Sequence, residues 1–332
     1  MIGRFAGLTG GLALLLALLL VAGLQIGFAP ISFPEVLAGL FGDPETDKVA
    51  LIVQELRLPR LLVGLVVGGS LGLSGAALQG LLRNPLADPG VIGVSASAGF
   101  GAVVAIHFGM AALSIYAIPV FAMAGALLAT GALYILARRD TSVLTLILVG
   151  IGINSLAGAL ISLAMNLAPS PYSLSDMVLW LLGSLSNRSM TDFYLALPFM
   201  AAGWLLLMLA APGLRSLTLG EEAAATLGLD LRRARLLVVF GTSLAVGAGV
   251  AVTGVVGFVG LIVPHMLRPF VGYDPSRPLV PSALGGAVLV LLADCVLRVL
   301  PGQEELKLGV VTALIGGPFF LYLVIRTRRQ MR

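Results

Sequence analysis

The chain has 332 residues, of which 58% are hydrophobic and 11% are charged, whereas a typical soluble domain carries about 25% charged residues. Its mean hydropathy of +1.05 excludes a soluble globular protein. The 42 glycines follow no Gly-X-Y period, which excludes collagen, and the long apolar runs exclude disorder. The composition therefore predicts an integral membrane protein with several spans.

Charge and cysteine content exclude further classes. The 20 basic and 16 acidic residues give a net charge of +4, but no basic face interleaved with aromatic side chains indicates a nucleic-acid partner. Cys295 is the single cysteine, so an intrachain disulfide is excluded. Neither His107 nor His265 has acidic neighbours at metal-ligand spacing. We therefore expect no nucleic-acid binding, no metal site and no cofactor bound by this chain.

Charge-free runs of the roughly 20 residues that a spanning helix needs predict an all-α chain with about ten membrane elements, in one transmembrane domain over residues 1–332. Residues 5–34 are interpreted as an uncleaved first helix, because the apolar part, residues 8–28, exceeds the roughly 7 to 15 residues of a signal-peptide core. Residues 91–137 carry no formal charge and predict two helices with a tight turn near residues 108–113. The other single spans are expected at residues 60–82, 143–167, 192–211, 281–299 and 308–325.

Two segments depart from a simple span. Residues 236–267 are uncharged over a length that is too great for one helix and too small for two. Gly254 and Pro264 within them predict a full helix followed by a short one, which is tolerated where protein or a water-filled cavity surrounds it. Residues 168–191 are expected to form a periplasmic interfacial segment with a short helix over residues 175–186, because Trp is enriched at headgroup level.

The distribution of charge predicts the orientation. Ten elements place both termini on one side of the membrane. Fourteen of the 20 basic residues lie on the side of Arg4, whereas nine of the 16 acidic residues lie in the opposite loops. Because cytoplasmic loops carry an excess of Lys and Arg, we expect both termini to be cytoplasmic.

Small and polar residues recur at every fourth position of two spans. In the second span they predict close approach of helix backbones; they are Gly64, Gly68, Gly72, Ala76 and Gly80. In the fifth span the repeat places five residues on one face; they are Gly150, Asn154, Gly158, Ser162 and Asn166. Its polar members, Asn154, Ser162 and Asn166, are candidates to line a pathway, and interhelical hydrogen bonding is the alternative.

Few ionisable residues lie within the predicted spans. Asp294 is the only acid well inside one, and Arg298 follows one turn later, which predicts an ion pair that neutralises both groups. A proton relay needs further buried ionisable groups, so the spans disfavour a proton-coupled or sodium-coupled transporter. His107 and His265 lie at span ends, where we expect ordinary hydrogen-bonded histidines; contact with a metal-bearing substrate is the alternative.

The chain has no energy-converting motif of its own. Neither Lys48 nor Lys307 lies in a P-loop, and hydrolase signatures are missing. Active transport therefore requires a partner. The polar residues 220–230 predict a short helix that docks this partner, within a cytoplasmic segment over residues 212–235. A mere connector between spans is the alternative.

Four sequence motifs, in order along the chain, resemble those of the FecCD-type permeases. They are ELRLPR at residues 55–60, RNPLADP at 83–89 with GVS at 93–95, GEEA at 220–223 continuing to Leu229, and GFVGLIVPH at 257–265. The resemblance extends from about residue 51 to residue 326. These permeases are ten-helix subunits of type II ABC importers for vitamin B12, haem and ferric siderophores.

The resemblance implies a set of partners in the bacterial inner membrane. A homodimer, or a pairing with a sister permease, encloses the path within the lipid bilayer. Two cytoplasmic ATP-binding subunits hold ATP and Mg, and a periplasmic substrate-binding protein delivers the substrate.

The resemblance also implies roles for individual residues. Docking of the binding protein is assigned to Arg57, Arg60 and Arg298, for which snorkelling to the membrane interface is the alternative. The cytoplasmic gate is assigned to Asn84, Leu86, Thr141 and Ser142. Coupling to the ATPase is assigned to the segment Glu221 to Leu229, with Glu221, Glu222, Ala224, Thr226 and Gly228.

The candidate pathway faces of the predicted spans are weakly polar and uncharged. They favour a large, mostly apolar, metal-bearing substrate that is released rather than held. Haem is our first expectation, and ferric siderophore and cobalamin stay open. An ion-coupled secondary transporter is the alternative from another class of transport. An intramembrane enzyme or a structural scaffold is the alternative outside transport.

Overall fold

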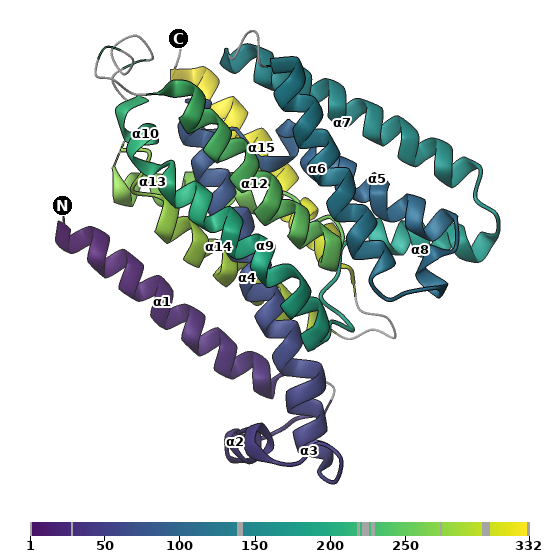
Figure 1. The fold of residues 1–332 in the computed structure, drawn as a ribbon. Coiled ribbons are helices and arrows are strands. Elements are labelled where there is room, and N and C mark those ends of the chain that lie inside the picture. Colours follow the sequence, from purple (N-terminus) through teal and green to yellow (C-terminus); the bar gives the residue numbers. More distant parts are fainter. Residues whose placement is uncertain are drawn as a thin grey trace.

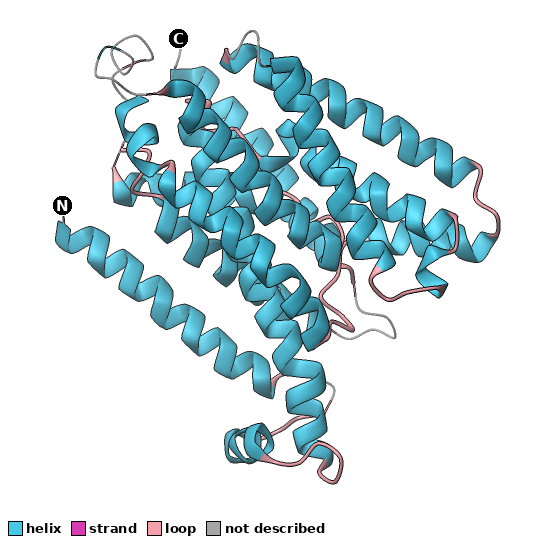
Figure 2. Cartoon of the chain, in the orientation of Figure 1, coloured by secondary structure: helices cyan, strands magenta, loops and turns pink. Residues whose placement is uncertain are grey.

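The computed structural model describes residues 2–27, 29–137, 142–217, 220, 226, 230–272, 274–300 and 306–330. Within these residues the chain forms helices joined by turns, and no strand is present (Figure 2). The expected all-α class is therefore confirmed. The first helix begins, and the last helix ends, at its upper-left end in Figure 1, as an even number of crossings requires.

The described helices include eight that are long and apolar enough to cross a membrane. Two shorter apolar helices accompany them, so the expected ten membrane elements are present. The long ones are α1 (Ile2–Gln25), α4 (Leu58–Leu81), α6 (Ala117–Ala137), α7 (Val143–Asn166), α9 (Met190–Leu209), α12 (Leu231–Thr253), α14 (Leu279–Val299) and α15 (Leu308–Gln330). The short ones are α5 (Val94–His107) and α13 (Val259–Val271).

Short helices join and extend these elements. α3 (Lys48–Leu51) and the π-helix η1 (Ile52–Arg57) lead directly into α4. The other short helices are α2 (Phe33–Phe41), η2 (Pro89–Ile92), η3 (Met110–Ala112), α8 (Pro171–Leu181) and α10 (Ala211–Ser216). η3 lies in the predicted turn between α5 and α6, which is confirmed.

α4 and α14 form the centre of the bundle through their glycines. A Cβ added to Gly72 would lie 1.9 Å from the Ser282 carbonyl oxygen, and one added to Gly68 would lie 2.5 Å from that of Gly286. Only glycine therefore permits this approach, and the predicted packing role of the ladder in α4 is confirmed. In the apolar stretch of α4, 89% of the residues are buried, against 6% in α1 and 17% in α7. α1 and α7 are thus peripheral helices.

The predicted break between a full and a short helix is also confirmed. α12 ends at Thr253, and Gly254 has φ +73°, with room for no side chain because a Cβ would lie 2.1 Å from the Trp180 carbonyl oxygen. The Thr253 carbonyl accepts from the Ser184 N–H at 2.7 Å, and the Val252 carbonyl accepts from the Arg188 guanidinium at 2.5 Å. The loop between α8 and α9 thus satisfies the helix end, as a break at membrane depth requires.

Two predicted boundaries were wrong, and one helical extension was missed. The first span ends at Gln25 rather than Pro34, because Pro34 belongs to the unpredicted helix α2. The predicted second span matches α4 closely, whereas the helical stretch that leads into it from Lys48, where the Asp47 side chain caps α3, was not predicted. The interfacial helix runs from Pro171 to Leu181 rather than over residues 175–186, because Ser170 caps it and Pro171 occupies its first turn.

Candidate functional site

Two of the three predicted docking arginines, Arg60 and Arg298, meet around Asp294 at the end of the bundle opposite the termini. The Arg60 Nη2 atom lies 2.8 Å from Asp294 Oδ1, and its Nε donates to the same oxygen at 3.0 Å. The Arg298 Nη2 atom lies 2.7 Å from Asp294 Oδ2. The exposed fractions of the three side chains are 12%, 5% and 1% for Arg60, Arg298 and Asp294. One buried carboxylate thus holds two guanidinium groups from α4 and α14, and we call these three residues the Asp294 cluster.

The arginines also bind the last carbonyls of α1. Arg298 Nη1 donates to the Gly23 oxygen at 2.9 Å, and Arg57 Nη1 donates to the Leu24 oxygen at 2.6 Å. A further hydrogen bond joins Arg57 to the Ala29 carbonyl. Cations are favoured at a helix C-terminus, where carbonyls lack intrahelical partners. Arg57 and Arg298 therefore fix the end of an otherwise peripheral helix to the bundle.

Sequence reasoning predicted part of this arrangement. The Asp294–Arg298 pair is confirmed. The contact between Arg60 and Asp294 was missed, because 234 positions separate them in the chain. The signal that could have found it is Arg60 at the edge of a predicted span, residues 60–82, that contains no acidic residue. The three arginines do share one end of the molecule, and their docking role stays a prediction.

Two of the predicted gate residues, Asn84 and Leu86, lie in the turn between α4 and α5. The Asn84 side-chain oxygen accepts from the Leu86 N–H at 2.9 Å, which fixes the start of the turn. Ser142 caps α7, and its oxygen accepts from the Thr145 N–H at 3.2 Å. Thr141 lies outside the described residues. The gate assignment therefore stays a prediction for Asn84, Leu86 and Ser142.

Gln79 is a connecting residue that the sequence reasoning missed. It is buried near the end of α4, where its amide nitrogen donates to the Leu261 carbonyl at 3.2 Å. Its amide oxygen accepts from Arg268 at 3.0 Å. Gln79 thus ties the end of α4 beside the gate turn to the short helix α13. A lone amide within an apolar helix was the available signal, because a buried polar group needs partners.

The candidate pathway residues all lie on the exposed side of α7. Asn154, Ser162 and Asn166 are exposed in this single chain. Gly150 does not share their face, since a Cβ there would lie 2.3 Å from the Val91 carbonyl oxygen. The correction follows from helix geometry, because each four-residue step rotates the repeat by about 40°.

Outward amides at membrane depth have a physical consequence. Hydrocarbon offers no hydrogen-bond partners, so polar side chains in spans face other protein or a water-filled cavity. Exposure of Asn154 in the middle of α7 therefore indicates that protein or water covers this helix, and either covering is compatible with the predicted pathway.

Most of the coupling residues lie outside the described part of the chain, namely Glu221, Glu222, Ala224 and Gly228. Of that set, Thr226 alone lies within it. After this stretch α12 begins with the Asp230 carboxylate accepting from the Arg233 N–H at 2.9 Å. The coupling assignment and the boundaries of residues 212–235 stay predictions.

The two histidines lie in different surroundings. His107 Nδ1 lies 3.2 Å from the Ala164 carbonyl oxygen, so the expectation of a hydrogen-bonded histidine is confirmed there. His265 makes an edge contact with Phe319 at a ring distance of 6.1 Å. Among the described residues no three His, Cys, Asp or Glu side chains gather as a metal site would require.

Comparison with known proteins decides the family. The profile of the FecCD transport family matches residues 14–326. The chain belongs to the FecCD transport family. It is accordingly a permease subunit of a type II ABC importer, as its sequence motifs indicated.

Relatives of this FecCD permease match it along most of their length. It is 37% identical over 325 residues to the hemin transport system permease of Yersinia pestis, a match that covers 97% of this chain and 96% of that one. It is 38% identical to the vitamin B12 import system permease of Salmonella typhi, over 87% of this chain and 88% of that one. A solved metal-chelate type ABC transporter in an inward-facing conformation superposes with a TM-score of 0.84 at 33% identity, covering 97% of this chain and 99% of that chain.

Proposed function

We propose that this FecCD permease carries a large iron-bearing compound, with haem as the first candidate, from the periplasm to the cytoplasm across the bacterial inner membrane. The substrate passes by alternating access along the interface between two copies of the chain, next to the exposed face of α7. Two discrete arrangements of one site are the physical requirement for such transport. The observation that carries the haem assignment is the similarity to the hemin permease over nearly the full length of both chains.

The energy for transport comes from partner subunits. Two cytoplasmic ATP-binding subunits hold ATP and Mg, and the permease itself binds no cofactor. A periplasmic substrate-binding protein docks near the Asp294 cluster and Arg57. The chain acts as the conduit and carries out no chemical reaction.

Uptake by reconstituted vesicles tests the proposal. The permease, its ATP-binding subunits and the binding protein are placed in proteoliposomes, and uptake of hemin, cobalamin and a ferric siderophore panel is measured with and without ATP. We expect ATP-dependent uptake of hemin above that of the others. Preferential uptake of cobalamin or a siderophore would support the importer function and overturn haem as the substrate. Uptake driven by an ion gradient without any ATPase would instead establish a secondary transporter.

The docking role of the arginines has its own test. Arg60→Gln removes a guanidinium from the predicted docking set, whereas Asp294→Asn perturbs the same cluster and leaves every arginine in place. We expect Arg60→Gln to weaken binding of the substrate-binding protein and to reduce its salt dependence, because charged interface groups govern both. Equal effects of the two variants would assign Arg60 a purely structural role.

A further inference from the structure

Residues 29–56 form a projection that we call the outer hairpin, made of α2, α3 and most of η1. It lies beyond the end of α1 and beyond the other helices at the bottom of Figure 1. The continuous helical stretch from Lys48 to Leu81 has 34 residues. At about 1.5 Å per residue it measures about 51 Å, against a hydrocarbon core of about 30 Å. The outer hairpin therefore stands outside the membrane, on the predicted periplasmic side.

The outer hairpin has its own small core and is held in one shape. Ile31, Val36 and Val53 are 7%, 2% and 0% exposed and pack together. The Gln54 amide donates to the carbonyls of Gly39 and Gly42, at 2.8 Å in each case. A surface on this unit is therefore presented in a defined geometry, which lowers the ordering cost of binding a partner.

One face of α2 carries large apolar side chains without a partner in this chain. Phe33, Leu37 and Phe41 follow at intervals of four residues and share a face. They are 47%, 45% and 91% exposed. Leu51 of α3 and Leu56 of η1 are exposed by 45% and 57%. Exposed apolar residues gathered on a rigid unit outside the membrane are typical of a protein interaction site.

The charge of the outer hairpin argues against a lipid surface as the occupant. Lys48 is its only basic residue, whereas it carries five carboxylates, which are Glu35, Asp43, Glu45, Asp47 and Glu55. Helices that lie on membranes carry Lys and Arg on their polar face, and anionic lipids repel carboxylates. The acidic surround instead complements a basic protein surface.

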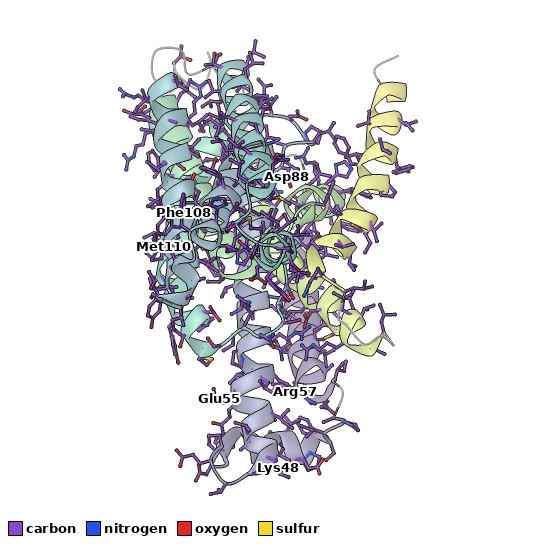
Figure 3. All side chains as sticks on the ribbon, turned by 90° about the vertical axis from the view of Figure 1, so that its right-hand side faces the viewer. Lys48, Glu55, Arg57, Asp88, Phe108 and Met110 are labelled. Carbon is purple, nitrogen blue, oxygen red and sulfur yellow. The ribbon has the colours of Figure 1, made fainter. Side chains whose placement is uncertain are left out.

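The outer hairpin is continuous with the predicted docking site. η1 ends at Arg57, which binds the end of α1. Figure 3 shows Lys48 farther from the bundle, with Glu55 and Arg57 on the helix that leads back to it. A protein seated over Arg57 and the Asp294 cluster therefore lies next to the outer hairpin.

We propose that the outer hairpin is a second docking surface for the substrate-binding protein, an inference that rests on the proposed importer function. The bound protein presents an apolar patch to Phe33, Leu37 and Phe41. Lysine or arginine side chains border this patch and face the carboxylates. Phe41 is the central anchor, because it has the most surface to lose from water and interface energy concentrates in such aromatic residues.

Binding of the purified substrate-binding protein to the permease in nanodiscs tests this inference. Phe41→Ser is the first variant, since a side chain 91% exposed contributes little to the fold. We expect it to weaken binding by about tenfold, as loss of an aromatic anchor does. Glu45→Lys with Glu55→Lys should weaken binding as well and reduce its salt dependence. Leu128→Ser on α6, which changes a side chain 74% exposed within a span, is the matched control and should leave binding unchanged.

The outcomes separate the inference from the proposed function. Unchanged affinity in Phe41→Ser and in the double lysine variant would overturn the outer hairpin as a docking surface while ATP-driven uptake still supports the importer. Absence of both uptake and binding by the unaltered protein would overturn the two together. Quenching of a Phe41→Trp variant by brominated lipid in the nanodisc would place α2 on the membrane and contradict the inference.

Discussion

At the scale of single residues, Asp294 stabilises the end of the bundle opposite the termini. Its carboxylate is 1% exposed and faces guanidinium groups from two helices. Removing one member of a buried ion pair leaves charge without compensation and costs about 3–5 kcal/mol. We therefore predict that Asp294→Asn lowers the unfolding midpoint of the purified permease by several degrees. The measurement is thermal unfolding in detergent.

Asp274→Asn is the control for that prediction. Asp274 lies 3.4 Å from Arg215 and 3.6 Å from Arg277, whose side chains are 70% and 43% exposed. Ion pairs with solvent-exposed arginines contribute about 0–1 kcal/mol, so this variant should unfold close to the unaltered protein. Equal shifts in both variants would contradict the structural importance of the Asp294 cluster.

Also at the residue scale, Glu35 makes the start of α2 sensitive to pH. Its carboxylate accepts from the Ser32 hydroxyl at 2.6 Å and from the Ser32 N–H at 2.7 Å. These hydrogen bonds, the hydroxyl first, hold the pKa of Glu35 below its ordinary value. Its contribution is thus complete above the ordinary pKa and is lost as the pH falls through the lowered pKa.

We predict that Glu35→Ala speeds amide hydrogen exchange at the start of α2 at neutral pH. The difference from the unaltered protein should disappear in acid, because the carboxyl group is then protonated in the latter as well. The two proteins are compared at the same pH each time, so that the intrinsic pH dependence of the exchange rate cancels from the difference. A difference in exchange rate that persists below the lowered pKa would show that the methylene groups of Glu35, rather than its charge, protect the start of α2.

At the scale of elements, the contact between α4 and α14 leaves no room for a methyl group at Gly72. A Cβ there would overlap the Ser282 carbonyl at 1.9 Å, whereas one at Gly158 of α7 meets nothing within 4 Å. Overpacking costs about 1–3 kcal/mol, and Gly→Ala in an open helix stabilises by about 0.5–1 kcal/mol. We predict opposite shifts of the unfolding midpoint for Gly72→Ala and Gly158→Ala. Shifts of the same sign would contradict the packing.

The same elements indicate what can be predicted from sequence. The ladder in α4 and the break after Thr253 were predicted, because glycine spacing and run length are local properties of the chain. α2 was missed because the uncharged run that contains α1 extends to Pro34, inside α2, so the sequence shows no boundary between the two helices. The apolar face of α2 also has no partner in this chain. Partners of Arg57, Arg60 and Gln79 were missed because each contact joins segments that only tertiary packing brings together.

At the scale of the whole molecule, burial decreases from the centre to the edge of the bundle. α4, α12 and α14 are buried over 89%, 78% and 67% of their apolar stretches, whereas α7 and α15 reach 17% and 22%. Peripheral apolar helices suit a lipid environment. α7 differs because Asn154 and Asn166 lie on its exposed side. The molecule is therefore asymmetric, with one edge that lipid alone satisfies poorly.

We predict that α7 faces a second copy of this chain across the substrate path. The single native cysteine is buried, so Cys295→Ser provides a background without reactive thiols. In that background, bismaleimides above a minimum length should crosslink Asn154→Cys to the same cysteine of the second copy. The length of the shortest reagent that reacts reports the width of the path. Leu128→Cys on α6, at a side chain that is 74% exposed, should yield no dimer with any of the reagents. Labelling of Asn154→Cys by a lipid-phase maleimide, without any crosslink, would place α7 against lipid and overturn the dimer interface at this helix.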